Sequence, residues 1–75
     1  ELIDVRNDAI AAFQRTHNGE TILAVHNLSD ARQKVSLPLK KPVKSLTDLL
    51  TQKQFMPAKE NLEIELLPYE YLLLK

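Results

Sequence analysis

The chain has 75 residues, a length that suits one small domain with a two-layer core but leaves no room for a deep substrate cavity. Ten basic residues balance ten acidic ones, so no overall field attracts nucleic acid or an anionic membrane surface. The absence of cysteine excludes disulfides and thiolate metal sites, and no apolar run approaches the roughly 20 residues that span a bilayer. We therefore expect a single domain over residues 1–75 with no nucleic-acid or membrane partner.

The N-terminal part of the chain reads as short strands joined by tight turns. The alternation in Ile3–Arg6 predicts a strand, and Ala9–Thr16 and Glu20–Asn27 form two further strand-like runs. Asn18-Gly19 separates these two runs and is the strongest short-range signal for a two-residue type I′ hairpin. Because the alternation begins within Glu1–Val5 and the chain does not start with methionine, we also expect it to be a piece of a longer polypeptide.

The two-residue turn predicts which residues of the hairpin lie opposite each other. Both sides of the hairpin carry apolar side chains, so we expect both to be covered. We place Phe13 in the core of the domain, and expect the second cover to come from a partner or another domain. The predicted cross-strand pairs are His17 with Glu20, Arg15 with Ile22 and Phe13 with Ala24 on one side, and Gln14 with Leu23 and Ala12 with Val25 on the other.

The rest of the chain continues the same pattern of short strands and turns. In one of these strands, Leu62, Ile64 and Leu66 point inward while Glu63 and Glu65 point outward. No run has the length and period of an amphipathic helix. The sequence thus predicts an all-β fold, an antiparallel two-sheet sandwich of about seven or eight short strands of Greek-key type. The remaining strands are expected over Arg32–Leu37, Val43–Leu50, Asn61–Leu66 and Tyr69–Leu74.

The order of these segments resembles one known family. Over about Ile3 to Lys75, the chain is similar to the C-terminal domain of the α-amylase superfamily, glycoside hydrolase family thirteen. It departs from the family pattern at Glu70, where glycine is common between the final tyrosines, and in the glycine-free turn 51–54. The segments that carry the resemblance are Phe13-x-Arg15, the hairpin, the apolar strand ending in Asn27-x-Ser29, the run Leu46–Leu50, and the closing Pro68-Tyr69-x-Tyr71 strand.

The resemblance implies an accessory role. In these enzymes, among them α-glucosidases, sucrose phosphorylases and amylosucrases, an antiparallel sandwich follows a catalytic (β/α)8 barrel and packs against it. The family's nucleophile, general acid and third carboxylate lie on barrel strands, and no segment of this chain matches their motifs. We therefore expect a non-catalytic domain whose partner is the barrel of its own parent chain, a glycoside hydrolase or transglycosylase, and which stabilises that barrel.

The residues themselves also offer little chemistry. Glu63 and Glu65 are two apart on one strand face, where a solvated pair is far more common than a catalytic pair in an apolar pocket. His17 and His26 are the two histidines, and the predicted register keeps them three rungs apart, too far to share a metal ion. We therefore expect no catalytic residue, no metal site and no cofactor.

Two tyrosines support an alternative function. Tyr69 and Tyr71 are two apart, so on one strand they would share a face and could stack against pyranose rings. This hypothesis makes the chain a carbohydrate-binding module that recruits α-glucan. A further alternative is self-association of the isolated chain through exposed strand edges.

Two short motifs are assigned no function. Lys40, Lys41 and Lys44 form a basic cluster without aromatic residues between them, which is typical of a solvated loop. Asn27-Leu28-Ser29 matches the glycosylation sequon, but we interpret the match as coincidence. Without a recognisable secretory signal, we expect a cytoplasmic rather than a secreted protein.

Overall fold

The computed structural model describes residues 2–39, 43–57 and 60–75. In these ranges the chain forms strands and turns but no helix, and therefore no helix that could cross a membrane. Every strand pairing is antiparallel, so the all-β prediction is confirmed. The strands are β1 (Ile10–His17), β2 (Glu20–Asn27), β3 (Gln33–Pro38), β4 (Leu46–Thr47), β5 (Gln54–Phe55), β6 (Asn61–Leu66) and β7 (Tyr71–Leu74).

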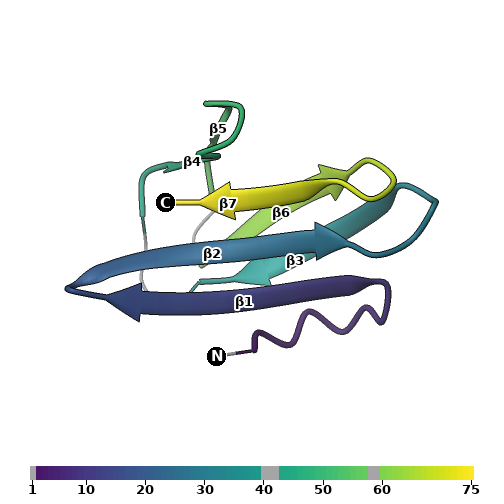
Figure 1. Cartoon of the computed structure of the whole chain (residues 1–75), viewed down its shortest axis with the longest axis horizontal. Coiled ribbons are helices and arrows are strands. Elements are labelled where there is room, and N and C mark those ends of the chain that lie inside the picture. Colours follow the sequence, from purple (N-terminus) through teal and green to yellow (C-terminus); the bar gives the residue numbers. More distant parts are fainter. Residues whose placement is uncertain (1, 40–42, 58–59) are drawn as a thin grey trace.

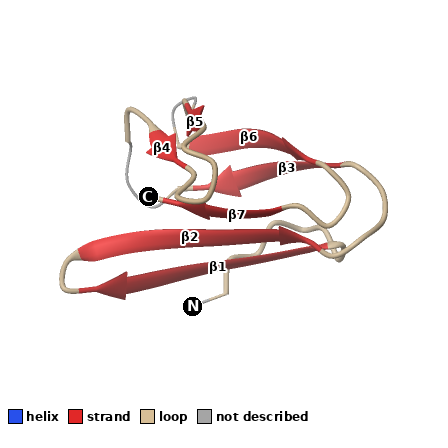
Figure 2. Cartoon of the chain, turned by 45° about the horizontal axis from the view of Figure 1, so that its top comes forward, coloured by secondary structure: helices blue, strands red, loops and turns tan. Residues whose placement is uncertain are grey.

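The strands form two layers, as Figure 1 and Figure 2 show. One layer is a three-stranded sheet in the order β1-β2-β7, called here the main sheet, and the other is the β3-β6 pair, called the second sheet. The short β4-β5 pair lies beside β7. The chain passes from the main sheet to the second sheet after β2 and returns after β6, which gives the predicted sandwich.

Alternation places one apolar side of each sheet in a common core. The core residues of the second sheet are the predicted inward ones, including Leu62, Ile64 and Leu66. The core side chains are at most 8% exposed, so both layers contribute to one core that is shielded from solvent. The core consists of Ile10, Ala12, Leu23, Val25, Val35, Leu37, Leu46, Leu62, Ile64, Leu66, Leu72 and Leu74.

The central hairpin forms as predicted. Asn18 and Gly19 have φ angles of 51° and 81°, the two positive values that a type I′ turn requires. The register pairs His17 with Glu20 and continues without a bulge, so every predicted cross-strand pair is present.

The prediction that Phe13 belongs to the core is wrong. Its side chain lies on the opposite side of the main sheet and is 44% exposed. The reason is the crossover after β2, which brings the second sheet against the side that carries Ala12 and Val25. The sequence shows two apolar sides but not which of them the second sheet covers.

The predicted strand Ile3–Arg6 is reduced to one bridge. Leu2 pairs with Phe13, and the amide of Ile3 donates to the carbonyl of Ala12 at 2.9 Å. Pairing then ends because Arg6 adopts a positive φ of 55° and its amide donates to the Asp4 carboxylate at 2.8 Å. This local turn leads the chain away from the sheet.

Two more predicted strands are shorter in the structure. The run Val43–Leu50 contributes only β4, followed by a bridge from Asp48 to Leu74. Tyr69 precedes β7 in a turn, with a φ of 59° that is incompatible with a strand. Of the predicted basic cluster, Lys40 and Lys41 lie outside the described residues, and Lys44 is exposed.

Candidate functional site

The side of the main sheet that faces away from the core, called here the outer face, is unusually apolar. Cross-strand partners share a face, so the register aligns Phe13, Ala24 and Leu73 in one row across all three strands. The next row contains His26 opposite Tyr71. The outer face thus exposes large apolar groups where the far side of a lone two-layer sandwich is normally polar.

The apolar row continues beyond both edges of the main sheet. Leu2 bridges to Phe13 on one side, and on the other side the Leu49 amide donates to the carbonyl of Leu73 at 2.8 Å. Leu2, Phe13 and Leu49 are 74%, 44% and 41% exposed. We call the set Leu2, Phe13, Ala24, Leu73 and Leu49 the apolar row.

A shallow open groove lies in the middle of the outer face. Ala24, with only a methyl group, forms its floor between the larger side chains of Phe13 and Leu73. Ile22 extends the floor along β2, and Arg15 and Tyr71 lie on its two sides. Such a depression accepts a protruding group but does not enclose a small molecule.

Charge on the outer face lies close to the hairpin turn. Lys75 and Glu20 form an ion pair with Nζ and Oε2 3.1 Å apart. Arg15 lies opposite the apolar Ile22, and none of the described carboxylates pairs with it. An exposed cation therefore borders the groove.

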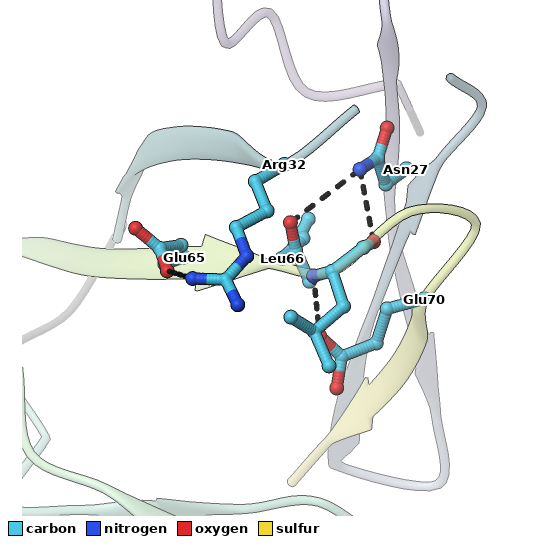
Figure 3. A network of polar contacts seen from close by, with 6 residues as sticks. Asn27, Arg32, Glu65, Leu66 and Glu70 are labelled. Carbon is cyan, nitrogen blue, oxygen red and sulfur yellow. Dashed lines mark hydrogen bonds and ion pairs between the residues drawn. The ribbon is translucent and has the colours of Figure 1, made fainter. Parts of the chain in front are cut away.

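The corresponding side of the second sheet is charged. Lys34 pairs with Glu65 across the strands, and Ser36 pairs with Glu63. The guanidinium of Arg32 also lies 3.5 Å from the Glu65 carboxylate (Figure 3). As predicted, Glu63 and Glu65 are exposed, and the ion pair of Glu65 with Arg32 is of the solvated kind that contributes little to stability.

The two candidate sugar-contacting tyrosines are both exposed but do not lie on one strand. Tyr71 starts β7 on the outer face and is 43% exposed, with its ring edge-on to that of His26 at a centroid distance of 5.3 Å and an angle of 71°. Tyr69 is 61% exposed in the preceding turn. The strand alternation that was expected to align the two rings is therefore absent, and sugar contact by either ring stays a prediction.

The two histidines have different surroundings. His17 is exposed at the end of β1, beside the hairpin turn, whereas His26 packs against Tyr71. Among the residues that the structure describes, no three His, Asp or Glu side chains gather in a way that could hold a metal ion.

Asn27 is a buried polar residue whose role the sequence analysis missed. Its Nδ2 donates to the carbonyl of Leu67 at 2.9 Å, with that of Leu66 at 3.5 Å (Figure 3). The same Nδ2 donates to the carbonyl of Ala31 at 2.8 Å. Its Oδ1 accepts from the amide and hydroxyl of Ser29. Asn27 thus joins the end of β2 to the end of β6 where the two sheets meet. The sequence signal was the Asn-x-Ser pattern of an Asx turn.

Asp48 holds the Leu49 end of the apolar row in place. Its carboxylate accepts from the Thr51 hydroxyl at 2.7 Å, the Leu73 amide at 3.1 Å and the Leu50 amide at 3.3 Å. Burial acts to raise the pKa of Asp48, but the hydrogen bonds from Thr51, Leu73 and Leu50 outweigh it and keep the pKa below its ordinary value. The charged carboxylate of Asp48 therefore stabilises both the end of the strand pairing with β7 and the turn that follows it.

A family model described as "Maltogenic Amylase, C-terminal domain" matches residues 1–73. The chain belongs to this family. The resemblance to the C-terminal domain of α-amylase-type enzymes is therefore confirmed, and the match covers nearly the whole chain. No curated protein sequence matches the chain.

Two solved structures share the fold of this maltogenic amylase C-terminal domain. The crystal structure of AmyP in complex with maltose has a TM-score of 0.80 at 20% identity and covers 91% of this chain. A variant of AmyP in complex with maltotriose has a TM-score of 0.83 at 21% identity and covers 99%. The chain spans only 14% and 16% of those two proteins. In both, this fold is a small part of a much longer polypeptide.

Proposed function

We propose that this domain is the non-catalytic C-terminal part of an amylase-type glycoside hydrolase or transglycosylase, and that it docks through its outer face onto the catalytic (β/α)8 barrel. The observation that carries this proposal is the apolar row, which crosses the main sheet from Leu2 to Leu49 and has no cover within the described residues. The family match and the length of the two AmyP chains support a large neighbouring domain as the cover.

The expected energy of such docking is substantial. If contact removes roughly 300 Å² of apolar surface from water, burial at about 25 cal/mol per Å² contributes about 7.5 kcal/mol before the loss of interdomain freedom. Contacts within one chain avoid most of that entropic loss, because the covalent connection already holds the two domains together. The docked domain therefore stabilises the barrel surface on which it lies.

The chemistry of the domain also supports an accessory role. Glycoside hydrolysis needs two carboxyl groups on either side of a bound sugar, one of them with a raised pKa. Glu63 and Glu65 lie exposed on the charged side of the second sheet, and the pKa of buried Asp48 is lowered. The glucan-module alternative depended on aligned tyrosine rings, and Tyr69 lies outside the strand that would align them.

The test compares two variants of the full parent chain by calorimetry and limited proteolysis. Phe13→Ser with Leu73→Ser removes the centre of the apolar row, and should separate one joint unfolding transition into two and speed cleavage between the domains. Lys34→Ser with Glu65→Ser changes two exposed positions on the opposite face and is the matched control. Identical behaviour of the two double variants would contradict docking through the outer face.

A further inference from the structure

We propose that the groove over Ala24 is the specificity-determining part of the docking face: it receives one bulky apolar side chain from a helix of the catalytic domain, and a carboxylate one turn along that helix pairs with Arg15. This inference rests on the proposed function and adds the chemistry of the partner segment to it.

The shape of the outer face supports the apolar half of this proposal. Ala24 is the smallest member of the apolar row and lies on the central strand, with Phe13 and Leu73 as its cross-strand neighbours and Ile22 next along β2. Neighbouring strands are about 4.8 Å apart, so the gap above a methyl group between two larger side chains suits a single branched or aromatic side chain. A helix presents such side chains as separate knobs, in the same way that knobs fill holes between packed helices.

The charge of the outer face supports the acidic half. Arg15 is exposed beside the groove, and no described carboxylate pairs with it, whereas Glu20 is already paired with Lys75. Arg15 and Phe13 are two residues apart on β1, which places them about 7 Å apart on the same face. Residues one turn apart on a helix are about 5–6 Å apart, so an apolar residue and a carboxylate at that spacing match both features.

Other occupants fit this surface less well. A pyranose ring prefers a flat aromatic face, whereas the two aromatic rings that line the groove, Phe13 and Tyr71, come from the two outer strands, on either side of an aliphatic floor made by Ala24 and Ile22. A second copy of the chain offers no unpaired carboxylate among the described residues of this face, because Glu20 is bound to Lys75. A helix of the parent chain is the expected occupant, since helices form the outer ring of a (β/α)8 barrel.

The first test uses the full parent chain with p-benzoylphenylalanine in place of Leu49, at the end of the apolar row. We expect photo-crosslinking within the same chain, to a helical peptide of the catalytic domain that contains a bulky apolar residue and an acidic residue one turn apart. A crosslink only between two copies, or to a segment without an acidic residue, overturns the inference.

The second test fills the groove and measures the yield of that crosslink. Ala24→Leu should abolish the crosslink while the domain stays folded, because leucine suits a strand at least as well as alanine. Ser36→Leu adds the same side chain to the outward side of the second sheet and should leave the yield unchanged. An unchanged yield in Ala24→Leu contradicts the inference.

The third test addresses Arg15. Arg15→Glu should weaken docking about tenfold at low salt, Arg15→Gln should weaken it less, and the difference between them should shrink as salt rises. Equal behaviour of the two variants at all salt concentrations excludes a facing carboxylate.

The double variant Phe13→Ser with Leu73→Ser distinguishes failure of this inference from failure of the proposed function. If it loses the crosslink and Ala24→Leu keeps it, docking stands and the groove has no specific role. If neither loses it, both proposals fail.

Discussion

The outward sides of the two sheets differ, although the same alternation builds both. On the second sheet, the outward positions of β3 and β6 carry Lys34, Ser36, Glu63 and Glu65. On the main sheet, the corresponding positions carry Phe13, Ala24 and Leu73, with Arg15 beside the groove and unpaired by any carboxylate that the structure describes. Alternation determines which side chains point away from the core. The polar or apolar character of these side chains then indicates which side faces water and which side contacts another surface.

The largest predicted effect comes from separating the two sheets. Asn27→Ala removes the amide that donates to Ala31 and Leu67 near the buried sheet junction, so these carbonyls keep only their bonds from the Ser29 hydroxyl and the Glu70 amide. It also removes the oxygen that accepts from the Ser29 amide and hydroxyl. We expect a loss of about 3 kcal/mol in the free energy of unfolding, measured by urea denaturation. Ser29→Ala, which keeps those carbonyls satisfied, is the control and should cost about 1 kcal/mol. Equal losses would show that Asn27 does not join the sheets.

The next effect concerns the Leu49 end of the apolar row. Asp48→Asn keeps the shape of the side chain but removes its charge, and should cost about 1–3 kcal/mol in the free energy of unfolding. Thr51→Val, which deletes the hydroxyl that donates to Asp48 and accepts from the Lys53 amide, should cost about half as much or less. If Asp48→Asn leaves the free energy of unfolding unchanged, the charge of Asp48 does not contribute to stability.

Asp48 also predicts a pH dependence. Its pKa is lower in the folded state, so the stabilisation is complete above the pKa of unfolded aspartate, about 3.9, and is lost as the pH falls through the lower folded-state value. Acid unfolding curves of the wild type and of Asp48→Asn should therefore converge below about pH 4. Parallel curves down to the lowest pH would contradict this assignment.

A smaller effect separates the two outward sides in the 75-residue chain itself. Phe13→Ser should change the free energy of unfolding by about 1 kcal/mol or less, since the ring is 44% exposed. If the isolated chain self-associates through its uncovered outer face, the same change should reduce that association in sedimentation. Self-association that persists in this variant would place the contact elsewhere, for example on a strand edge.

The smallest effect belongs to the charged side. Replacing both Lys34 and Glu65 by serine should change the free energy of unfolding by about 0.5 kcal/mol or less, because both groups are exposed and the ion pair of Glu65 with Arg32 is screened by solvent. A loss above 2 kcal/mol in urea denaturation would show that this side has a structural role.

The sequence predicted the parts of the fold that local chemistry determines. Asn18-Gly19 set the hairpin and its whole register, and the alternation of Leu62, Ile64 and Leu66 set the inward side of β6. Local patterns did not predict the outward position of Phe13, because that depends on which side the second sheet covers. Local patterns also missed the burial of Asn27 and Asp48. Each side chain has some partners close in sequence, but the bonds to Leu67 and Leu73 join residues that are 40 and 25 positions apart.

The burial of Asn27 has a consequence for recombinant production. Oligosaccharides are attached to Asn-x-Ser in extended chains, and Asn27-Leu28-Ser29 is available in the unfolded chain. Once folded, the Asn27 side chain is fully buried and its Nδ2 is engaged with backbone carbonyls, which leaves no space for a glycan. In a eukaryotic secretory host, a chain that is glycosylated at Asn27 before it folds could not pack its two sheets together. Bacterial expression avoids this competition between modification and folding.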